Sequence, residues 1–169
     1  AAAALIFVKL KQYQVLARPA INKWAVSNLL LIFFGTVFQT IPTFKSGTIS
    51  SLGMGFWGPN THDGVWHLAL VSQIIKGLPP QNPIFSGENL TNYHYFYDLL
   101  VGVTAKVTQI EVVDLIFRFY PVFFSLALGM ATYSLSKKLY NSNLATAFSL
   151  FSVYFTGSFG WIVEYIRER

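Results

Sequence analysis

Long apolar stretches without charged residues alternate with polar segments along the chain. Three of these stretches, 24–44, 116–138 and 139–163, are long enough to cross a bilayer as a helix, which takes about 20 apolar residues. Asn141 and Asn143 interrupt the start of the third. We therefore predict about three transmembrane helices and an all-α, polytopic membrane fold.

Basic residues predict which side of the membrane each segment faces. Four of them precede the first predicted helix: Lys9, Lys11, Arg18 and Lys23. Lys137 and Lys138 separate the second helix from the third. The positive-inside rule places both groups in the cytoplasm. Residues 45–115 are then expected to form one long loop on the outer face, and 164–169 to lie at the outer end of the third helix.

Two shorter helices are predicted within the outer loop, near 62–76 and near 93–107. The first follows a turn-rich stretch, and it carries Asp63 in its first turn, where the helix dipole favours an anion. The second begins in the tyrosine-rich sequence NYHYFYDLL. Both are expected to lie beside the membrane surface.

An alternative topology treats 95–113 as a further span. That stretch contains Asp98, Lys106 and Glu111. Counting it as a fourth span would also place Lys137 and Lys138 on the outer side of the membrane. An amphipathic helix lying on the outer membrane surface satisfies the charge rule better.

Composition supports a membrane protein and excludes several classes. Hydrophobic residues make up 53% of the 169 residues and charged residues 11%, whereas a soluble domain is about 25% charged. This composition excludes disorder. Cysteine is absent, which excludes disulfides, a thiol nucleophile and cysteine-bound metals. The net charge of +5 reflects basic groups beside the predicted spans, and no pattern typical of nucleic-acid binding is present.

We interpret residues 1–23 as the remaining end of an earlier helix followed by a basic cytoplasmic segment. Its apolar run AAAALIFV is too short to span, and its charges follow the run, unlike those of a signal peptide. We expect the chain to belong to a longer multi-pass protein of the cell membrane, whose other helices would pack against these.

Residues able to carry chemistry recur at helical spacing in the outer loop. Three pairs are four residues apart: Asp63 with His67, His94 with Asp98, and Tyr93 with Tyr97. Imidazole and carboxylate groups bind transition metals, so His94 and Asp98 are candidate metal ligands that would complete a site with the first pair. Ordinary hydrogen bonding is the alternative for each histidine, and a membrane-interface belt is the alternative for the tyrosines.

Arg118 lies at the outer end of the second predicted span, against the positive-inside trend. An anionic partner is therefore expected there. A lipid-linked phosphate is one candidate, and an ion pair with Asp114, one helical turn earlier, is the other.

The order of these motifs resembles a known family. The string comprises THDGVWH with Asp63, LPPQNPIFSGENL, YHYFYDLL, RFYP with Arg118 and Pro121, and SKKLYNS. Over residues 24–160 it resembles the N-terminal part of the GT-C membrane glycosyltransferases, the superfamily of protein mannosyltransferases and lipid-A aminoarabinose transferases.

The resemblance implies transfer of a sugar from a polyprenyl-phosphate donor on the outer face. It implies that Asp63 is the catalytic base, although His62 and Gly64 stand where the family usually has a second acidic residue. Arg118 is then expected near the donor phosphate. Three further candidates for substrate binding are His67, Tyr93 and Tyr97. Some members use a divalent metal, Mg²⁺ or Mn²⁺.

A non-catalytic membrane subunit or a transporter-like protein is the alternative function. A transporter is expected to carry ionisable residues at mid-membrane depth, and the centres of the three predicted spans contain none. The enzyme hypothesis additionally predicts that Asp63 and Arg118 face a common crevice.

Overall fold

The computed structural model describes residues 23–157, which are mostly helical, as the sequence predicts. The elements are α2 (Lys23–Phe44), β1 (Thr48–Ser50), β2 (Gly53–Gly55), the 3-10 turn η1 (Gly58–Thr61), α3 (Asp63–Lys76), α4 (Phe96–Thr108), α5 (Val112–Asp114), the π-helical turn η2 (Leu115–Phe119), α6 (Tyr120–Tyr140) and α7 (Asn143–Phe155). The predicted helix stump in 1–22, the end of the third predicted span and the outer end at 164–169 lie outside this range.

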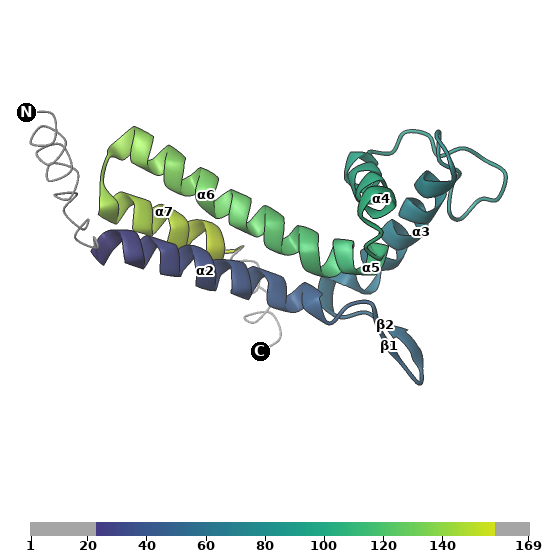
Figure 1. Cartoon of the computed structure of the whole chain (residues 1–169), viewed down its shortest axis with the longest axis horizontal. Helices are drawn as coiled ribbons and strands as arrows, with labels where there is room; N and C mark the ends of the chain where they lie inside the picture. Colours follow the sequence, from purple (N-terminus) through teal and green to yellow (C-terminus); the bar gives the residue numbers. More distant parts are fainter. Residues whose placement is uncertain (1–22, 158–169) are drawn as a thin grey trace, which may run out of the picture.

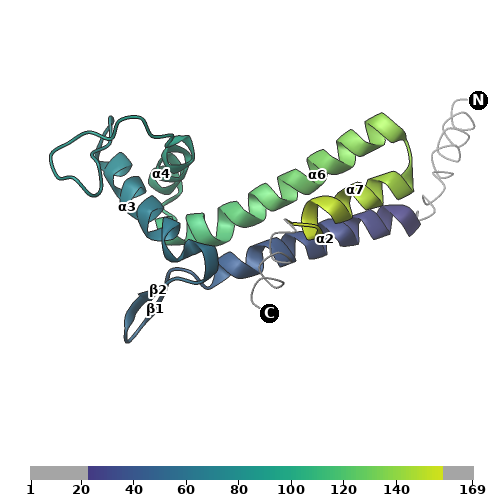
Figure 2. The same ribbon diagram turned by 180° about the vertical axis from the view of Figure 1, so that it is seen from behind.

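Helices α2, α6 and α7 lie side by side and form a three-helix bundle (Figure 1). The rest of the described chain sits at one end of it, and the view from behind shows the same arrangement (Figure 2). We call residues 45–111 the cap. The chain leaves the bundle at the end of α2 and returns to the same end through α5, so the cap is a single excursion. Lys23, Lys137 and Lys138 lie at the opposite end of the bundle.

One large side chain, Tyr154, packs between two glycines inside the bundle. A Cβ added to Gly35 of α2 or to Gly129 of α6 would overlap Tyr154 of α7. The Tyr154 hydroxyl donates a hydrogen bond to the Ser125 carbonyl at 2.7 Å, and the Ser125 hydroxyl donates to Gln39 Oε1 at 2.8 Å. The two glycines therefore let the backbones approach closely enough for polar contacts between helices.

Large apolar side chains cover the outside of the bundle. The exposed ones include Leu29, Phe33, Phe34, Phe38, Ile41, Phe123, Leu128, Leu135, Leu144, Phe148 and Phe151. Two helices of the described chain, α2 and the continuous helix Val112–Tyr140, are long and apolar enough to cross a membrane. Helix α7 is shorter, with 13 residues.

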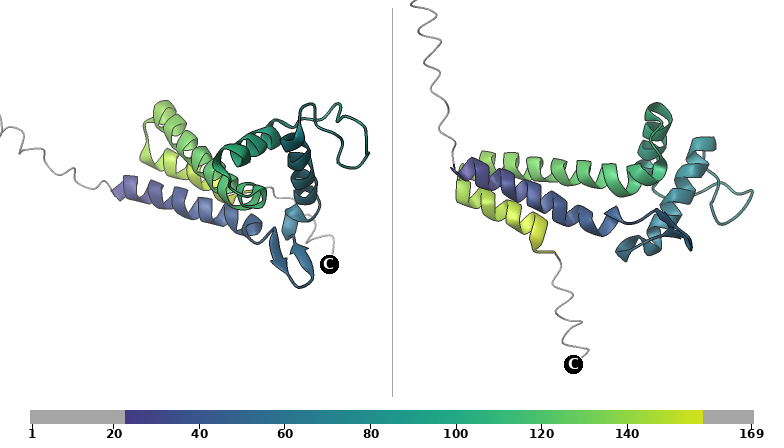
Figure 3. Two further views of the ribbon diagram at one scale, coloured as in Figure 1. Left: turned by 45° about the vertical axis from the view of Figure 1, so that its right-hand side comes forward. Right: turned by 60° about the horizontal axis from the view of Figure 1, so that its bottom comes forward.

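The cap has a separate apolar core. Helices α3 and α4 pack against each other and against the start of the Val112–Tyr140 helix (Figure 3). Buried side chains come from all three: Val71, Val101, Ala105, Leu115, Ile116 and Phe117. The cap also contains the antiparallel hairpin β1–β2, which the all-α prediction omitted. Its turn is closed locally, by the Ser50 hydroxyl donating to the Gly53 carbonyl.

The π-helical turn η2 lies where the cap meets the bundle. Its wider winding is marked by the bond from the Tyr120 N–H to the Leu115 carbonyl, five residues earlier. The Phe117 carbonyl accepts a hydrogen bond from Thr43 Oγ1 at 3.1 Å. This bond ties the end of α2 to the point where the chain re-enters the bundle.

Candidate functional site

Arg118 lies in η2, at the junction of cap and bundle, with its side chain 23% exposed. Its Nη1 donates to Asp114 Oδ1 at 2.7 Å, which is the ion pair considered from the sequence. Its Nη2 donates to the Ser46 carbonyl at 3.4 Å, and the Phe44 ring centroid lies 6.0 Å from Cζ. A guanidinium has five N–H donors, so these two hydrogen bonds leave donors for an anion.

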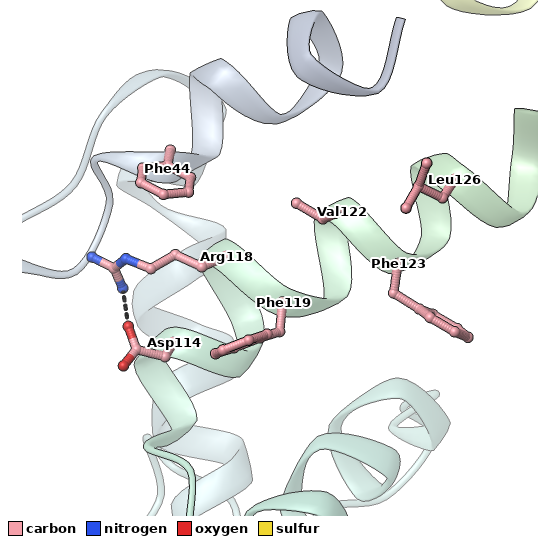
Figure 4. Close-up of a pocket in the computed structure, with 7 residues that line it drawn as sticks. All are labelled: Phe44, Asp114, Arg118, Phe119, Val122, Phe123 and Leu126. Carbon is pink, nitrogen blue, oxygen red and sulfur yellow. Dashed lines mark hydrogen bonds and ion pairs between the residues drawn. The ribbon is translucent and has the colours of Figure 1, made fainter. Parts of the chain in front are cut away.

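A groove of about 640 Å³ extends from this arginine along α6 (Figure 4). Its lining consists of Phe44, Asp114, Arg118, Phe119, Val122, Phe123 and Leu126. The ion pair forms one end, and apolar side chains on successive turns of α6 line the remainder (Figure 4). The groove therefore has a polar end, made by an ion pair, and an apolar remainder.

Asp63 begins α3 and is open to solvent, with its side chain 79% exposed. Its Oδ1 lies 3.5 Å from Nδ1 of His62, which is exposed as well. Asp63 does not line the groove that contains Arg118, so that groove is not the predicted common crevice. The two segments are nevertheless adjacent, because a Cβ on Gly64 would lie 2.9 Å from Cζ of Phe117.

Asp98 pairs with His67 and not with His94. Asp98 Oδ1 lies 2.7 Å from His67 Nδ1, although the two residues are 31 positions apart and belong to different helices. The expected i, i+4 pairing with His94 is absent because α4 begins only at Phe96, so His94 precedes the helix. The left-handed backbone of Asn92 (φ 56°) lies in this non-helical approach.

The predicted metal site is not assembled by the described residues. Within 23–157, no group of three or more His, Asp or Glu side chains is arranged to hold a metal ion. His94 instead stacks on the ring of Tyr93, with centroids 4.9 Å apart. Binding of Mg²⁺ or Mn²⁺ stays a prediction.

The two tyrosines predicted to bind substrate have different surroundings. Tyr93 packs edge-on against Trp66, with centroids 5.4 Å apart. Tyr97 lies edge-on to His67 at 6.2 Å and 5.8 Å from the Tyr120 ring. Burial, and then the charges of Asp98 and Tyr120, raise the pKa of Tyr97 to about 12. Tyr97 therefore keeps its phenolic proton to a higher pH than an exposed tyrosine does.

Two groups that form hydrogen bonds in this region were not predicted from the sequence. Tyr120 directly follows the RF of RFYP, and its hydroxyl lies 2.6 Å from Thr104 Oγ1. The 16-residue separation between them gives no local signal. The Ser46 carbonyl that accepts from Arg118 was missed as well, because a backbone acceptor leaves no mark in a sequence.

Comparison with protein-family models, with curated proteins and with solved structures finds no match for this chain.

Proposed function

We propose that the chain forms part of a multi-pass membrane glycosyltransferase of the GT-C type, which transfers a sugar from a polyprenyl-phosphate donor to an acceptor on the outer face of the cell membrane. The observation that carries the proposal is the groove along α6, with Arg118 at one end and apolar side chains along the rest. Further helices of the same longer protein would complete the site.

The packing of the bundle supports membrane insertion. Helices in lipid associate through small residues and polar contacts, and expose apolar side chains to acyl chains. The contacts of Gly35, Gly129 and Tyr154, surrounded by exposed leucines and phenylalanines, have this character. We propose that α2, α6 and α7 are the three spans. The lysines at the end opposite the cap then favour a cap on the outer side.

Donor binding is assigned to Arg118. Arginine recognises phosphate through paired N–H donors, and such charge-assisted bonds are strong in a partly dry site. The guanidinium is already oriented by Asp114 and the Ser46 carbonyl, so little side-chain entropy remains to be lost on binding. The polyprenyl chain would lie along Val122 and Leu126, toward the lipid.

The transfer itself needs a base on the acceptor side. Asp63 occupies the position that the GT-C resemblance gives to the base, and its exposed carboxylate is accessible to an acceptor hydroxyl. The neighbouring His67 is a second candidate proton acceptor. The described residues do not fit a metal site, so no step is derived through Mg²⁺ or Mn²⁺.

A non-catalytic membrane subunit is the second candidate. The ion pair of Arg118 with Asp114 favours this alternative, because Asp114 by itself supplies the anionic partner that was expected for Arg118 from the sequence. Under this alternative the groove would hold ordinary lipid.

The test uses the full-length protein in nanodiscs with photoreactive undecaprenyl phosphate and undecaprenyl-phosphate sugars labelled in the sugar. Arg118→Gln is expected to weaken photolabelling at least tenfold, since it removes the charge that holds the phosphate. Lys138→Gln, at the far end of the bundle, is the matched control and should leave labelling unchanged. Asp63→Asn should reduce sugar transfer while labelling persists. Absence of labelling and transfer in the wild type would refute the proposal in favour of the subunit.

A further inference from the structure

His67 and Asp98 form a buried carboxylate–imidazole pair between α3 and α4. Asp98 is 1% exposed, and its Oδ1 lies 2.7 Å from Nδ1 of His67. The His67 side chain is 30% exposed, so the imidazole is partly accessible to solvent. This is the arrangement in which a carboxylate orients a histidine for proton transfer.

The pairing fixes which nitrogen of His67 accepts a proton. A carboxylate only accepts hydrogen bonds, so the proton of the neutral imidazole must lie on Nδ1. Nε2 is then left with its lone pair. Within residues 23–157, Nε2 makes no hydrogen bond that would occupy that lone pair. The free nitrogen is therefore a base held in one tautomer.

The second oxygen of Asp98 argues against a purely structural clamp. Asp98 Oδ2 is buried and has no hydrogen-bond partner in the described part of the chain. An unpaired buried carboxylate oxygen is costly, and an asparagine would hold the same Nδ1–H without placing a negative charge in the interior. The negative charge of Asp98 becomes favourable when the imidazole takes up a proton during a reaction, because the carboxylate then stabilises the imidazolium.

The pair packs against the first turns of the helix that carries Arg118. His67 contacts Tyr97, and the Tyr97 ring lies 6.2 Å from Phe124 on the first turns of α6. On the same helix as His67, one turn earlier, Gly64 lies against Phe117, the residue before Arg118. The imidazole and the guanidinium thus belong to neighbouring parts of one packed unit.

We propose that His67 is the catalytic base of the glycosyl transfer and that Asp98 is its positioning residue; this inference rests on the proposed function. Nε2 takes the proton from the acceptor hydroxyl as its oxygen forms the bond to the anomeric carbon. The bond between that carbon and the phosphate oxygen breaks, and the electron pair leaves with polyprenyl phosphate. The imidazolium then gives its proton to water. Asp63, one turn earlier, contacts the acceptor.

The kinetic test uses the full-length protein in nanodiscs with the undecaprenyl-phosphate sugar that the wild type uses. A general base contributes about 10²–10⁴-fold, so His67→Ala should lower kcat by about 10²-fold or more with KM little changed. Added imidazole should restore part of the rate, which a structural role would not allow. Asp98→Asn should also lower kcat while keeping the α3–α4 contact. Lys138→Gln, at the opposite end of the bundle, is the control and should leave kcat unchanged.

A second measurement is independent of glycosyl transfer. Diethylpyrocarbonate modifies the free nitrogen of histidine, and mass spectrometry resolves His67 from His62 and His94. At about pH 8, where a free imidazole is neutral, Asp98→Asn should slow labelling of His67 and leave the other two unchanged. If Asp98→Asn slows labelling of His67 but the wild type transfers no sugar, the proposed reaction is refuted. The conclusion that Asp98 orients His67 as a base would still hold.

Two outcomes would overturn the inference itself. One is an identical labelling rate of His67 in the wild type and in Asp98→Asn. The other is normal kcat in His67→Ala with complete loss of transfer in Asp63→Asn, which would assign the base to Asp63. Circular dichroism of each variant checks that the helices are retained.

Discussion

The bundle and the cap have different interiors, although the helix Val112–Tyr140 packs in both. In the core of the cap, Val71 of α3 and Val101 of α4 are buried together with Phe117 of η2. In the bundle, the largest apolar side chains lie outside, and Tyr154 packs between glycines within. The cap nevertheless exposes large apolar side chains of its own, among them Leu52, Phe96 and Val107. The two regions therefore differ in what fills their interiors, which is an apolar cluster in the cap and a tyrosine between glycines in the bundle.

The most disruptive change is expected at the centre of the cap core. Phe117→Ala removes a fully buried ring, and such a cavity costs about 3–5 kcal/mol of unfolding free energy. Hydrogen exchange of the protein in nanodiscs should accelerate in residues 45–111. Phe33→Ala, at a bundle position that is 60% exposed, is the control and should change exchange in neither region. Equal effects of the two variants would contradict the contrast between the regions.

A smaller effect is expected from filling the bundle interior. Gly129→Leu would push Tyr154 out of its position between α2 and α6, and overpacking of this kind costs about 1–3 kcal/mol. Exchange should then accelerate in α7 and leave the cap peptides unchanged. Met130→Leu, on the neighbouring exposed position, is the control. Acceleration confined to the cap would show that the bundle does not depend on this contact.

High pH should weaken the cap selectively through Tyr97. The pKa of this phenol is about 12 in the folded protein against 10 in an unfolded chain, so the folded state holds the proton more tightly. Stability is therefore complete below pH 10 and falls as pH rises from about 10 to 12. Absorbance of the phenolate at alkaline pH, compared with Tyr97→Phe, measures this. A tyrosine titrating normally at this position would contradict the expected burial.

The smallest effect is expected from removing one hydroxyl inside the bundle. Tyr154→Phe deletes the 2.7 Å bond to the Ser125 carbonyl but keeps the ring between the glycines. Polar contacts between helices in lipid contribute about 0.6 kcal/mol on average. Reversible unfolding in mixed micelles is sensitive enough to measure it. A loss as large as that of Gly129→Leu would mean that the hydrogen bond, and not the ring, holds the helices together.

The sequence predicts the helices well where a local rule applies. Charge-free apolar length indicates α2 and the helix through α6, and the first-turn position of Asp63 marks the start of α3. The partners of side chains could not be predicted in the same way. His94 and Asp98 have helical spacing, but the helix begins between them, and Asp98 meets His67 through the tertiary packing of two helices. The spacing of residues along the sequence can predict contacts within one helix, but it cannot predict contacts between helices.

The hydrogen bond from Thr43 to the Phe117 carbonyl joins the two points where the chain enters and leaves the cap. In topological terms, the cap is an insertion into a helical hairpin, and both ends of the insertion are fastened at the same place. An insertion anchored in this way can change length or sequence without moving the hairpin that carries it. The three-helix bundle can thus keep a constant frame while the inserted segment varies.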